Sequence, residues 1–483
     1  MGADRVVMPP PGLNQHFGFG EAVEYLTVEQ LVTQRPVEAF VIAVLPGRCR
    51  GDVKRLHADL GQPFLNCSRD KFRAIVGPDI CWRPASDEQL RQGGQNILVT
   101  EPTRNDERQT FTAGFVETRL RHLVASGEVR ARVVAPAPWF PSSSPRFGSY
   151  ADFARIPHHE ERIGFSIDHP KYLLLPKIGM KTTPAMMYAA ALPVLRRLQK
   201  ERDFDLIDAH YFYPDGVAAA WLGRKLNKPV VITSRGTDVN LIPQFRLPRQ
   251  MILKAAESAA HLIAVSQVLK DEMAGFGIPA DRITVLRNGV DLKLFNPGGR
   301  GEARAAFGMS GKTLLSVGWL IERKGHDLII SALPSLPDYT LFIAGSGPEK
   351  ANLEALAKRL GVESRVRVLG NLPQVQLQKA FAAADALILA SSREGWPNVL
   401  LESMACGSPV VASNVWGNPE VVAKPAAGVL MKSRTAEGVA EGVTRLFANL
   451  PARTATRAYA EDFSWDSTTQ GQITLFKKIL ART

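Results

Sequence analysis

The chain has 483 residues, 45% of them hydrophobic and 22% charged, and this length predicts two domains because it is too great for one core. No apolar run approaches the roughly 20 residues that cross a bilayer, and residues 1–11 lack the apolar stretch of a signal peptide, so we expect a cytoplasmic protein. The net charge of +12 favours polyanionic neighbours such as phosphorylated substrates, whereas no recognisable module points to nucleic acid.

Residues 1–95 differ in style from the rest of the chain. Residues 25–32 could form a helix and residues 39–45 a strand, but no βαβ rhythm develops. This stretch is an accessory domain, a poorly ordered extension or the product of a start site assigned too far upstream, and we favour the last two. The four cysteines (Cys49, Cys67, Cys81 and Cys406) form no C-x-x-C pair, which argues against zinc and disulfides.

A regular alternation of strands and helices begins at residue 96. We expect strands at residues 97–100, 132–135, 206–209, 230–233, 262–265 and 284–286. The helices expected in this half are residues 114–126, 185–199 and 216–226. Strands that alternate with helices imply right-handed crossovers and a doubly wound parallel sheet, so residues 96–295 are predicted to form a Rossmann-like domain.

A second series follows the Pro/Gly-rich stretch 296–301, which is the best linker candidate. Strands are expected at residues 314–317, 340–343, 366–369, 386–389 and 409–412. The helices between and after them are expected at residues 327–332, 349–360, 374–383 and 398–405. Residues 302–462 would form a second Rossmann-like domain, followed by a helix in the segment 463–483. Two such domains create a cleft between the carboxyl ends of two sheets, where ligands bind.

Residues 393–407, with the sequence REGWPNVLLESMACG, are the most informative segment. They follow a predicted strand and open a helix near Asn398, so backbone amides at the helix N-terminus would favour an anionic or polyhydroxyl ligand. Glu394 would lie at the mouth of the cleft, and Glu402 just over one turn into the helix. Two carboxylates at this spacing suit hydroxyl recognition, one on a transferred sugar and one on a ribose.

This segment resembles the retaining glycosyltransferases of family 4, which have the GT-B fold of two Rossmann-like domains. Their hallmark is a pair of glutamates separated by seven residues, which Glu394 and Glu402 match, and only Ser403 departs mildly from the usual context. The resemblance extends from about residue 96 to the C-terminus. It implies that the last helix braces the first domain, and that the donor is bound by the motif residues Glu394, Gly395, Trp396, Pro397, Asn398, Val399 and Glu402.

Arg323 and Lys324 lie in the loop after the first strand of the second domain and suit a diphosphate, since arginine offers a fork and lysine a point charge. Relatives commonly have G-R-x-x-x-x-K-G here. Lys324 matches the lysine, but Trp319 stands where the first arginine is usual. We expect Arg323 to assume part of that arginine's role.

Glycines at three loops are further candidates for donor contacts. Gly345 and Gly347 lie where a predicted strand turns into a helix and would let the backbone approach the nucleotide. By the resemblance, Leu369 and its neighbours would contact the base through their backbone. Gly114 alone carries the match to a Gly-Gly pair that approaches the phosphates in relatives.

Three residues at strand ends of the first domain are expected to face the cleft. The resemblance makes His210 a ligand of a donor-sugar hydroxyl. Relatives often have T-x-H-G-x-D at the next strand, where this chain has Arg235 in place of the histidine and retains Asp238. Asp238 is expected near the acceptor or as an organiser of its loop.

The resemblance implies a hexosyltransferase that moves a sugar from a nucleoside-diphosphate sugar with retention of configuration and without a metal or other cofactor. The product would belong to a surface polysaccharide or glycolipid. A sugar-nucleotide epimerase of the same fold and a non-catalytic sugar-nucleotide-binding protein are the alternatives. A Rossmann dehydrogenase is disfavoured, because no complete dinucleotide fingerprint follows the first strand.

The acceptor is expected to be a glycan or a lipid-linked molecule. We interpret the region from Pro136 to His169 as a variable loop. Its basic and aromatic residues suggest peripheral contact with an anionic membrane, although a solvent-facing loop explains them equally well. These residues are Trp139, Phe140, Arg146 and Phe147.

Overall fold

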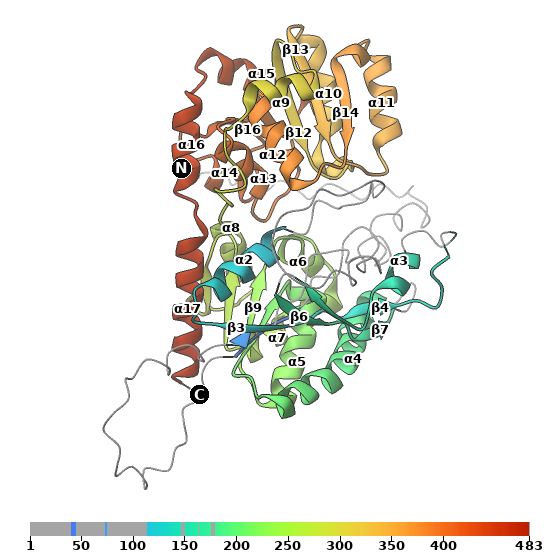
Figure 1. Ribbon diagram of the computed structural model, residues 1–483, viewed down its shortest axis with the longest axis vertical. Helices are drawn as coiled ribbons and strands as arrows, with labels where there is room; N and C mark the ends of the chain where they lie inside the picture. The colour runs from blue at the N-terminus through green and yellow to red at the C-terminus, as the bar shows by residue number, and fades with distance from the viewer. Residues whose placement is uncertain are drawn as a thin grey trace, which may run out of the picture.

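The computed structural model describes residues 40–44, 73–74, 114–144, 146, 150–162, 164–174 and 179–482. They form two α/β domains, the first below the second in Figure 1, with α16 (Arg453–Glu461) and α17 (Trp465–Leu480) running along one side of both. No helix among these residues is both long and apolar enough to cross a membrane.

The first domain is built on a sheet with the strand order β11-β10-β9-β8-β1-β2-β3-β6-β5. Its strands are β1 (Phe40–Val44), β2 (Arg73–Ala74), β3 (Arg130–Val134), β5 (His159–Arg162), β6 (Phe165–Asp168), β8 (Ile207–His210), β9 (Val230–Ser234), β10 (His261–Ala264) and β11 (Ile283–Val285). Strands β8 to β11 are parallel, with helices α5 (Val217–Leu226), α7 (Arg246–Ser258) and α8 (Gln267–Gly275) as crossovers. Every residue of β8 and β9 is buried, as expected of parallel strands covered on both faces.

This sheet departs from the purely parallel arrangement predicted from the sequence. Strand β1 comes from the first 95 residues and pairs antiparallel with both β3 and β8. Strand β5 pairs antiparallel with β6, because only two residues join them and a parallel pair needs a long crossover. The strand predicted at residues 97–100 and the helix predicted at residues 25–32 lie outside the described residues.

The region after Pro136, interpreted above as a loop, contains regular structure, which corrects that interpretation. It holds β4 (Ala137–Trp139), α3 (Tyr150–Arg155), β5 and β6, and β4 pairs with β7 (Lys171–Leu173). Each element is too short to produce a recognisable hydrophobic period. Helices α2 (Gly114–Ala125) and α4 (Gly179–Glu201) flank this region in the chain.

The second domain has an entirely parallel sheet with the order β14-β13-β12-β15-β16-β17. Its strands are β12 (Lys312–Val317), β13 (Tyr339–Ala344), β14 (Val366–Gly370), β15 (Ala386–Leu389), β16 (Val410–Ala412) and β17 (Gly428–Leu430). Its helices are α9 (Arg300–Phe307), α10 (His326–Ala332), α11 (Lys350–Arg359), α12 (Gln374–Ala383), α13 (Asn398–Ala405), α14 (Asn418–Val421) and α15 (Ala436–Ala448). The chain reverses its direction of winding between β12 and β15, and ligands bind at such switch points in open α/β sheets.

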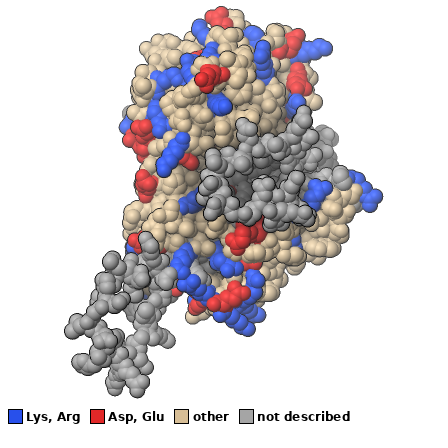
Figure 2. Space-filling model, in the orientation of Figure 1, with Lys and Arg blue, Asp and Glu red and all other residues tan. Residues whose placement is uncertain are grey.

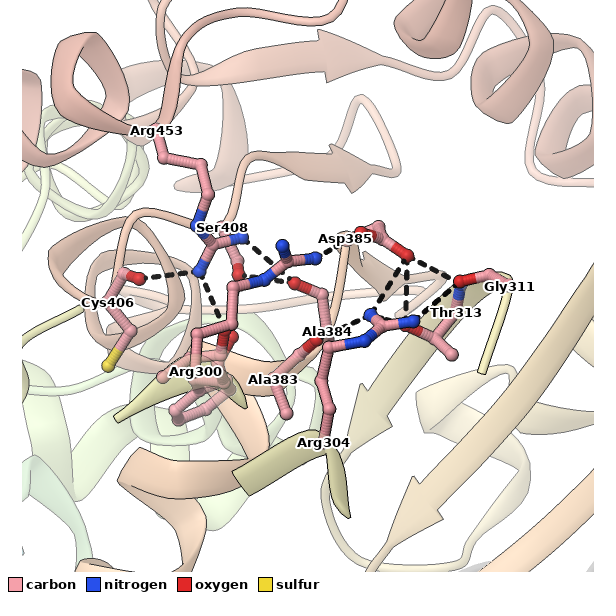
Figure 3. A network of polar contacts seen from close by, with 12 residues as sticks. Arg300, Arg304, Gly311, Thr313, Ala383, Ala384, Asp385, Cys406, Ser408 and Arg453 are labelled. Carbon is pink, nitrogen blue, oxygen red and sulfur yellow. Dashed lines mark hydrogen bonds and ion pairs between the residues drawn. The ribbon is translucent and has the colours of Figure 1, made fainter. Parts of the chain in front are cut away.

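A cluster of arginines attaches α9 and α16 to the second sheet where β12 and β15 begin, at the end of these strands away from the ligand-binding edge (Figure 3). Asp385, directly before β15, accepts hydrogen bonds from the Thr313 amide at 2.8 Å and from Arg304 at 3.4 Å, and it also pairs with Arg300. Arg453 of α16 donates to the carbonyl oxygens of Ala382, Ala384 and Cys406. This cluster lets α16 leave the second domain in a fixed direction.

Helix α17 continues from α16 and packs against α2 of the first domain. Its Gln472 is buried there, where Nε2 donates to Asp208 Oδ2 at 2.6 Å and Oε1 accepts from Arg119 Nε at 2.8 Å. Burial lowers the pKa of Arg119 to about 9 and raises that of Asp208 to about 7. The last helix therefore supplies an amide that bridges two buried ionisable groups of the first domain.

Replacing Gln472 with leucine should destabilise the protein, because Gln472→Leu leaves both buried groups with fewer partners. We expect the free energy of unfolding to fall by about 2–3 kcal/mol, as for lost hydrogen bonds to charged groups. Urea denaturation measures this change. The control is Gln470→Leu at an exposed position of the same helix, where a change within about 0.5 kcal/mol is expected. An equal effect of both substitutions would contradict the bridging role.

Candidate functional site

The two central strands of the second sheet bring Lys324, Arg323 and Glu394 together. Lys324 follows β12 in a short 3-10 turn and Glu394 follows β15, and β12 and β15 are neighbours. Lys324 Nζ donates to Glu394 Oε1 at 2.6 Å. Arg323 Nη1 donates to the carbonyl oxygen of Arg393 at 2.9 Å and lies 3.9 Å from Glu394 Oε1. The predicted basic pair and the first motif glutamate thus form one cluster.

The charges of this cluster fix the ionisation of Glu394. Burial alone would raise the pKa of its carboxyl, but the charges of Lys324 and Arg323 and the bond from Lys324 lower it to about 2. Glu394 is therefore a carboxylate at neutral pH, and the three side chains together carry one net positive charge. Such a group suits a ligand with an anionic part, which the cations would bind, and with hydroxyl groups, which the carboxylate would bind.

The glycines of the neighbouring loops are required by contacts within the protein. A Cβ on Gly345 would lie 1.9 Å from the carbonyl oxygen of Gly318, and one on Gly347 would lie 2.4 Å from that of Leu320. The amide of Gly345 donates to the carbonyl oxygen of Gly370, next to Leu369 at the end of β14. The loops after β12 and β13 therefore pack backbone to backbone beside the Lys324 cluster, which by itself accounts for both glycines.

The turn before α13 meets the first domain directly. A Cβ on Gly395 would lie 1.9 Å from the carbonyl oxygen of Arg235 and 2.8 Å from the Cα of Gly236, so only glycine fits. Trp396 Nε1 donates to the carbonyl oxygen of Asn288 at 3.1 Å, and Asn288 Nδ2 donates to Asn398 Oδ1 at 3.3 Å. Pro397 precedes α13, and Val399 is half-buried in its first turn.

The second motif glutamate has a different electrostatic environment from the first. Glu402 lies half-buried in α13, and burial raises the pKa of its carboxyl to about 7. At neutral pH Glu402 is thus balanced between its two protonation states, whereas Glu394 is ionised. The neighbouring Ser403 donates its buried hydroxyl to the carbonyl oxygen of Ser408, which explains why a serine is tolerated there.

In the first domain, Arg235 and His210 form a buried pair. Arg235 Nη2 lies 2.7 Å from His210 Nδ1, so Nδ1 must accept and the proton of the imidazole resides on Nε2. Burial, together with the charges of Arg235 and Arg119, holds the pKa of His210 well below its usual range, so the ring is neutral. Nε2 lies 3.6 Å from Asp208 Oδ2.

Asp238 organises the loop that carries Arg235. Its carboxylate accepts hydrogen bonds from the backbone amides of Phe212, Arg235 and Gly236, at 2.7–3.2 Å. These bonds hold the loop after β9 against the segment after β8. Asp238 therefore organises this loop through backbone amides of its own domain.

Asn288 was not singled out in the sequence, yet it links the two domains. Besides its bonds to Trp396 and Asn398, its Oδ1 accepts from Arg235 Nη1 at 3.3 Å, and its side chain is buried. An Asn-Gly pair one residue after a predicted strand is a turn signal, so the turn could have been recognised. The direction of the side chain could not, because it depends on residues more than 100 positions away.

Other predicted positions lie apart from this cluster or outside the described residues. Gly114 begins α2, and the loop before it lies outside the described residues. Trp139 in β4 is 51% exposed and is paired with Leu173 of β7, which is 46% exposed. Arg146 is exposed and Phe140 half-buried, whereas Phe147 lies outside the described residues.

Two family models together match most of the chain. The model described as glycosyltransferase family 4 matches residues 120–294, and the one described as glycosyl transferases group 1 matches residues 302–463. TuaC of Bacillus subtilis (strain 168), named as a candidate glycosyltransferase of teichuronic acid biosynthesis, is 31% identical over 344 residues, which cover 68% of this chain and 84% of TuaC. A D-inositol 3-phosphate glycosyltransferase of Mycobacterium leprae (strain Br4923) is 33% identical over 245 residues, 48% of this chain and 55% of the relative.

Solved structures share the fold. A sucrose-phosphate synthase from Thermosynechococcus elongatus aligns with a TM-score of 0.63 at 20% identity, over 77% of this chain and 95% of the other. Anabaena HepE in complex with UDP and glucose aligns with a TM-score of 0.59 at 21% identity, over 75% of this chain and 95% of the other. These likenesses confirm the predicted GT-B fold.

The pairing of Lys324 with Glu394 should make the stability of the fold depend on pH. The pKa of Glu394 in the folded protein is about 2, below its ordinary value of 4.5, so the pair stabilises fully above about pH 4.5 and the contribution is lost as the pH falls towards 2. Lys324→Met should lower the free energy of unfolding by about 2–3 kcal/mol at pH 7, and by less than about half of that at pH 3.

Urea denaturation at the two pH values measures both differences. The control Lys350→Met removes an exposed lysine that lies 3.9 Å from Glu354, and a change of under about 0.5 kcal/mol is expected at both pH values. A difference for Lys324→Met that stays constant between pH 7 and pH 3 would refute the assignment to Glu394.

Proposed function

The chain belongs to the family 4 glycosyltransferases, and we propose that it transfers a hexosyl group from a nucleoside-diphosphate sugar to a glycan or lipid-linked acceptor, with retention of anomeric configuration. The observation that carries this proposal is the cluster of Lys324, Arg323 and Glu394 beside the contact between Gly395 and the first domain. It combines cations for a diphosphate, a carboxylate for sugar hydroxyls and two domains that meet at the same place.

The donor is a nucleotide sugar whose diphosphate lies against Lys324 and Arg323. A guanidinium and an ammonium match the two negative phosphate groups, and the first amides of α13 add a favourable helix terminus. Anabaena HepE, which shares the fold, has been solved in complex with UDP and with UDP-glucose, which supports this class of donor. Glu402 accepts hydrogen bonds from the ribose, and Glu394 from hydroxyls of the sugar.

The reaction is a substitution on one face of the sugar. The bond from the anomeric carbon to the diphosphate oxygen breaks, and the acceptor oxygen forms its bond on the same face. The acceptor hydroxyl gives its proton to the departing phosphate, so no protein nucleophile is needed. Lys324 and Arg323 stabilise the negative charge that develops on the leaving group, and the transfer proceeds without a metal ion.

His210 holds a hydroxyl of the donor sugar from the first domain, and Arg235 lies beside it on the acceptor side. Because Nδ1 of His210 accepts a hydrogen bond from Arg235, Nε2 carries the proton of the ring. Nε2 can therefore donate a hydrogen bond to a hydroxyl of the donor sugar. Arg235 also presents its backbone to Gly395, so the two residues lie where the motif of the second domain arrives. Asp238 fixes this loop on the acceptor side.

The acceptor belongs to surface polysaccharide or glycolipid synthesis, and the protein acts in the cytoplasm, in peripheral contact with an anionic membrane. One relative is named for teichuronic acid synthesis and others for D-inositol 3-phosphate, which supports a glycan or phosphorylated acceptor. The exposed Trp139 and Leu173 lie side by side on β4 and β7 and would suit a membrane surface. Figure 2 shows Lys and Arg side chains over the lower end of the first domain, with Asp and Glu among them.

A panel of nucleotide sugars with the purified protein tests this function, and the assay follows donor cleavage and the anomer formed. With the active donor, Lys324→Ala should lower kcat by about 100-fold, as for other lost contacts to a developing anion. Glu402→Ala should weaken donor binding by about 10- to 100-fold, as for a lost charged hydrogen bond. The control Glu363→Ala, at an exposed position of the second domain, should leave both quantities unchanged.

EDTA should leave turnover intact, and turnover that requires a metal ion would contradict the proposal. Unchanged transfer in both Lys324→Ala and Glu402→Ala would reject the assigned site. Donor binding without cleavage by the unaltered protein would instead support the non-catalytic alternative, which the tryptophan at position 319 keeps open. Release of a free epimer would support the epimerase.

The affinity for UDP should rise with pH, because an ionised carboxylate accepts hydrogen bonds from the ribose more strongly than a protonated carboxyl does, and the pKa of Glu402 is about 7. Calorimetric titration between pH 6 and pH 8 should show affinity increasing by up to about tenfold, with the pKa of Glu402 lower in the complex. Glu402→Gln is the matched control, since the phosphate of UDP titrates equally in both proteins. The same pH dependence in Glu402→Gln would exclude Glu402 as its source.

A further inference from the structure

Glu420 of the second domain caps a helix of the first. Its Oε2 accepts from the amide of Gln267 and its Oε1 from the amide of Val268, both at 3.0 Å. These are the first two residues of α8, whose amides have no partner within the helix. The third amide of α8 is taken by the side chain of Ser266, its own N-cap. A carboxylate more than 150 positions away thus completes the capping of this helix.

A third donor from the first domain reaches the same carboxylate. Arg287 Nη2 donates to Glu420 Oε2 at 2.7 Å and its Nε does so at 3.2 Å. The guanidinium also lies 5.7 Å from the centre of the Trp396 ring, so it contacts both Glu420 and the 393–407 motif. An isolated exposed ion pair contributes little to stability. The Glu420 carboxylate, however, is only 18% exposed, and it binds two helix amides at the positive end of α8 as well as Arg287.

The segment that carries Glu420 also supports the loop of Glu394. The amide of Gly417 donates to the carbonyl oxygen of Glu394 at 3.3 Å. A Cβ on Gly417 would lie 2.4 Å from the carbonyl oxygen of Gly395, so the two segments pack backbone to backbone. Ser413 Oγ donates to the carbonyl oxygen of Ser391 at 2.6 Å. Residues 413 and 417 therefore contact the Glu394 loop at three of its residues.

One residue in this segment has an unfavourable backbone conformation. Trp416 has a backbone φ of 47°, a value that residues other than glycine, asparagine and aspartate rarely adopt. Such strain persists only where the surrounding contacts fix the backbone, and it is common at functional sites. Trp416 lies between Ser413, which contacts the Glu394 loop, and Glu420, which contacts the first domain.

We propose that Glu420 is a positioning residue for the transfer reaction. When the two domains meet, its carboxylate binds the α8 terminus and Arg287, and this contact holds residues 413–417 and hence the carbonyl groups around Glu394 in place. Domain contact and placement of the Glu394 carboxylate are thereby coupled through one short segment. The inference rests on the proposed transferase function, because it assumes that the placement of Glu394 matters for transfer.

Hydrogen exchange of the full-length protein, with and without UDP, tests the coupling without relying on turnover. In Glu420→Ala, exchange should increase about tenfold both in residues 266–269 and in residues 391–396. The control Glu461→Ala removes an exposed glutamate that pairs with Arg457 within α16, and it should change neither segment. Faster exchange in residues 266–269 alone would reduce Glu420 to a local cap and overturn the proposal.

Kinetics supply the second readout. Glu420→Ala should lower kcat about tenfold while the donor KM changes less than about threefold, because the donor contacts themselves remain. Glu420→Gln should recover part of the loss, since its amide oxygen still accepts one backbone bond. An active unaltered protein whose Glu420→Ala variant keeps full kcat would overturn the inference alone. An unaltered protein without any transfer would count against the proposed function, and the exchange result would still judge the coupling.

Arg287→Gln serves if Glu420→Ala does not fold. It weakens the same contact from the first domain and leaves the α8 amides capped. A smaller increase in exchange in both segments is then expected, with kcat lowered about threefold. Exchange and kcat equal to those of the unaltered protein would overturn the proposal.

Discussion

Direct backbone contact between Gly395 and the loop at Arg235 and Gly236 determines how the rest of the site is arranged. A single added Cβ at position 395 would lie 1.9 Å from the Arg235 carbonyl oxygen, so the two domains can approach to this distance only because a glycine stands there. The approach brings Trp396 onto the carbonyl oxygen of Asn288 and Asn398 onto its amide. It also places the Lys324 cluster at the junction of the two domains.

The two glutamates of the motif are only eight positions apart, yet the protein assigns them opposite electrostatic environments. Glu394 is half-buried against two cations, and its pKa is about 2. Glu402 is half-buried, and burial moves its pKa towards neutrality. A permanently charged carboxylate can orient Lys324, whereas a carboxyl near its pKa changes its ionisation when its surroundings change.

The departures from the family pattern are accommodated by nearby contacts. Arg235, where relatives often have histidine, pairs with His210 and Asn288 and thereby fixes the tautomer of the imidazole. Arg323, expected to assume part of the role of the absent arginine at position 319, is held by the carbonyl oxygen of Arg393 within the same cluster as Lys324. Both arginines are thus tied to the junction between the domains.

The sequence by itself determined the alternation of strands and helices and the motif that identifies the family, because both are local patterns. The ranges 386–389, 374–383 and 398–405 were predicted to the residue for β15, α12 and α13. The proximity of Lys324 and Glu394 also follows from the strand order, once β12 and β15 are known to be neighbours. Short elements such as β4 and β7 were missed, since three residues are too few to show a period.

Only the tertiary structure decided which distant side chains complete the site. Asn288 joins the two domains, Gln472 bridges Arg119 and Asp208, and Glu420 caps α8, each through partners more than 100 residues away. No local pattern identifies the contacts of these side chains. A glutamine on a helix or a glutamate before a valine is common in sequences, and its distant partners are known only from the fold. The same holds for the entry of β1 into the first sheet, since strand pairing depends on which edges are brought together.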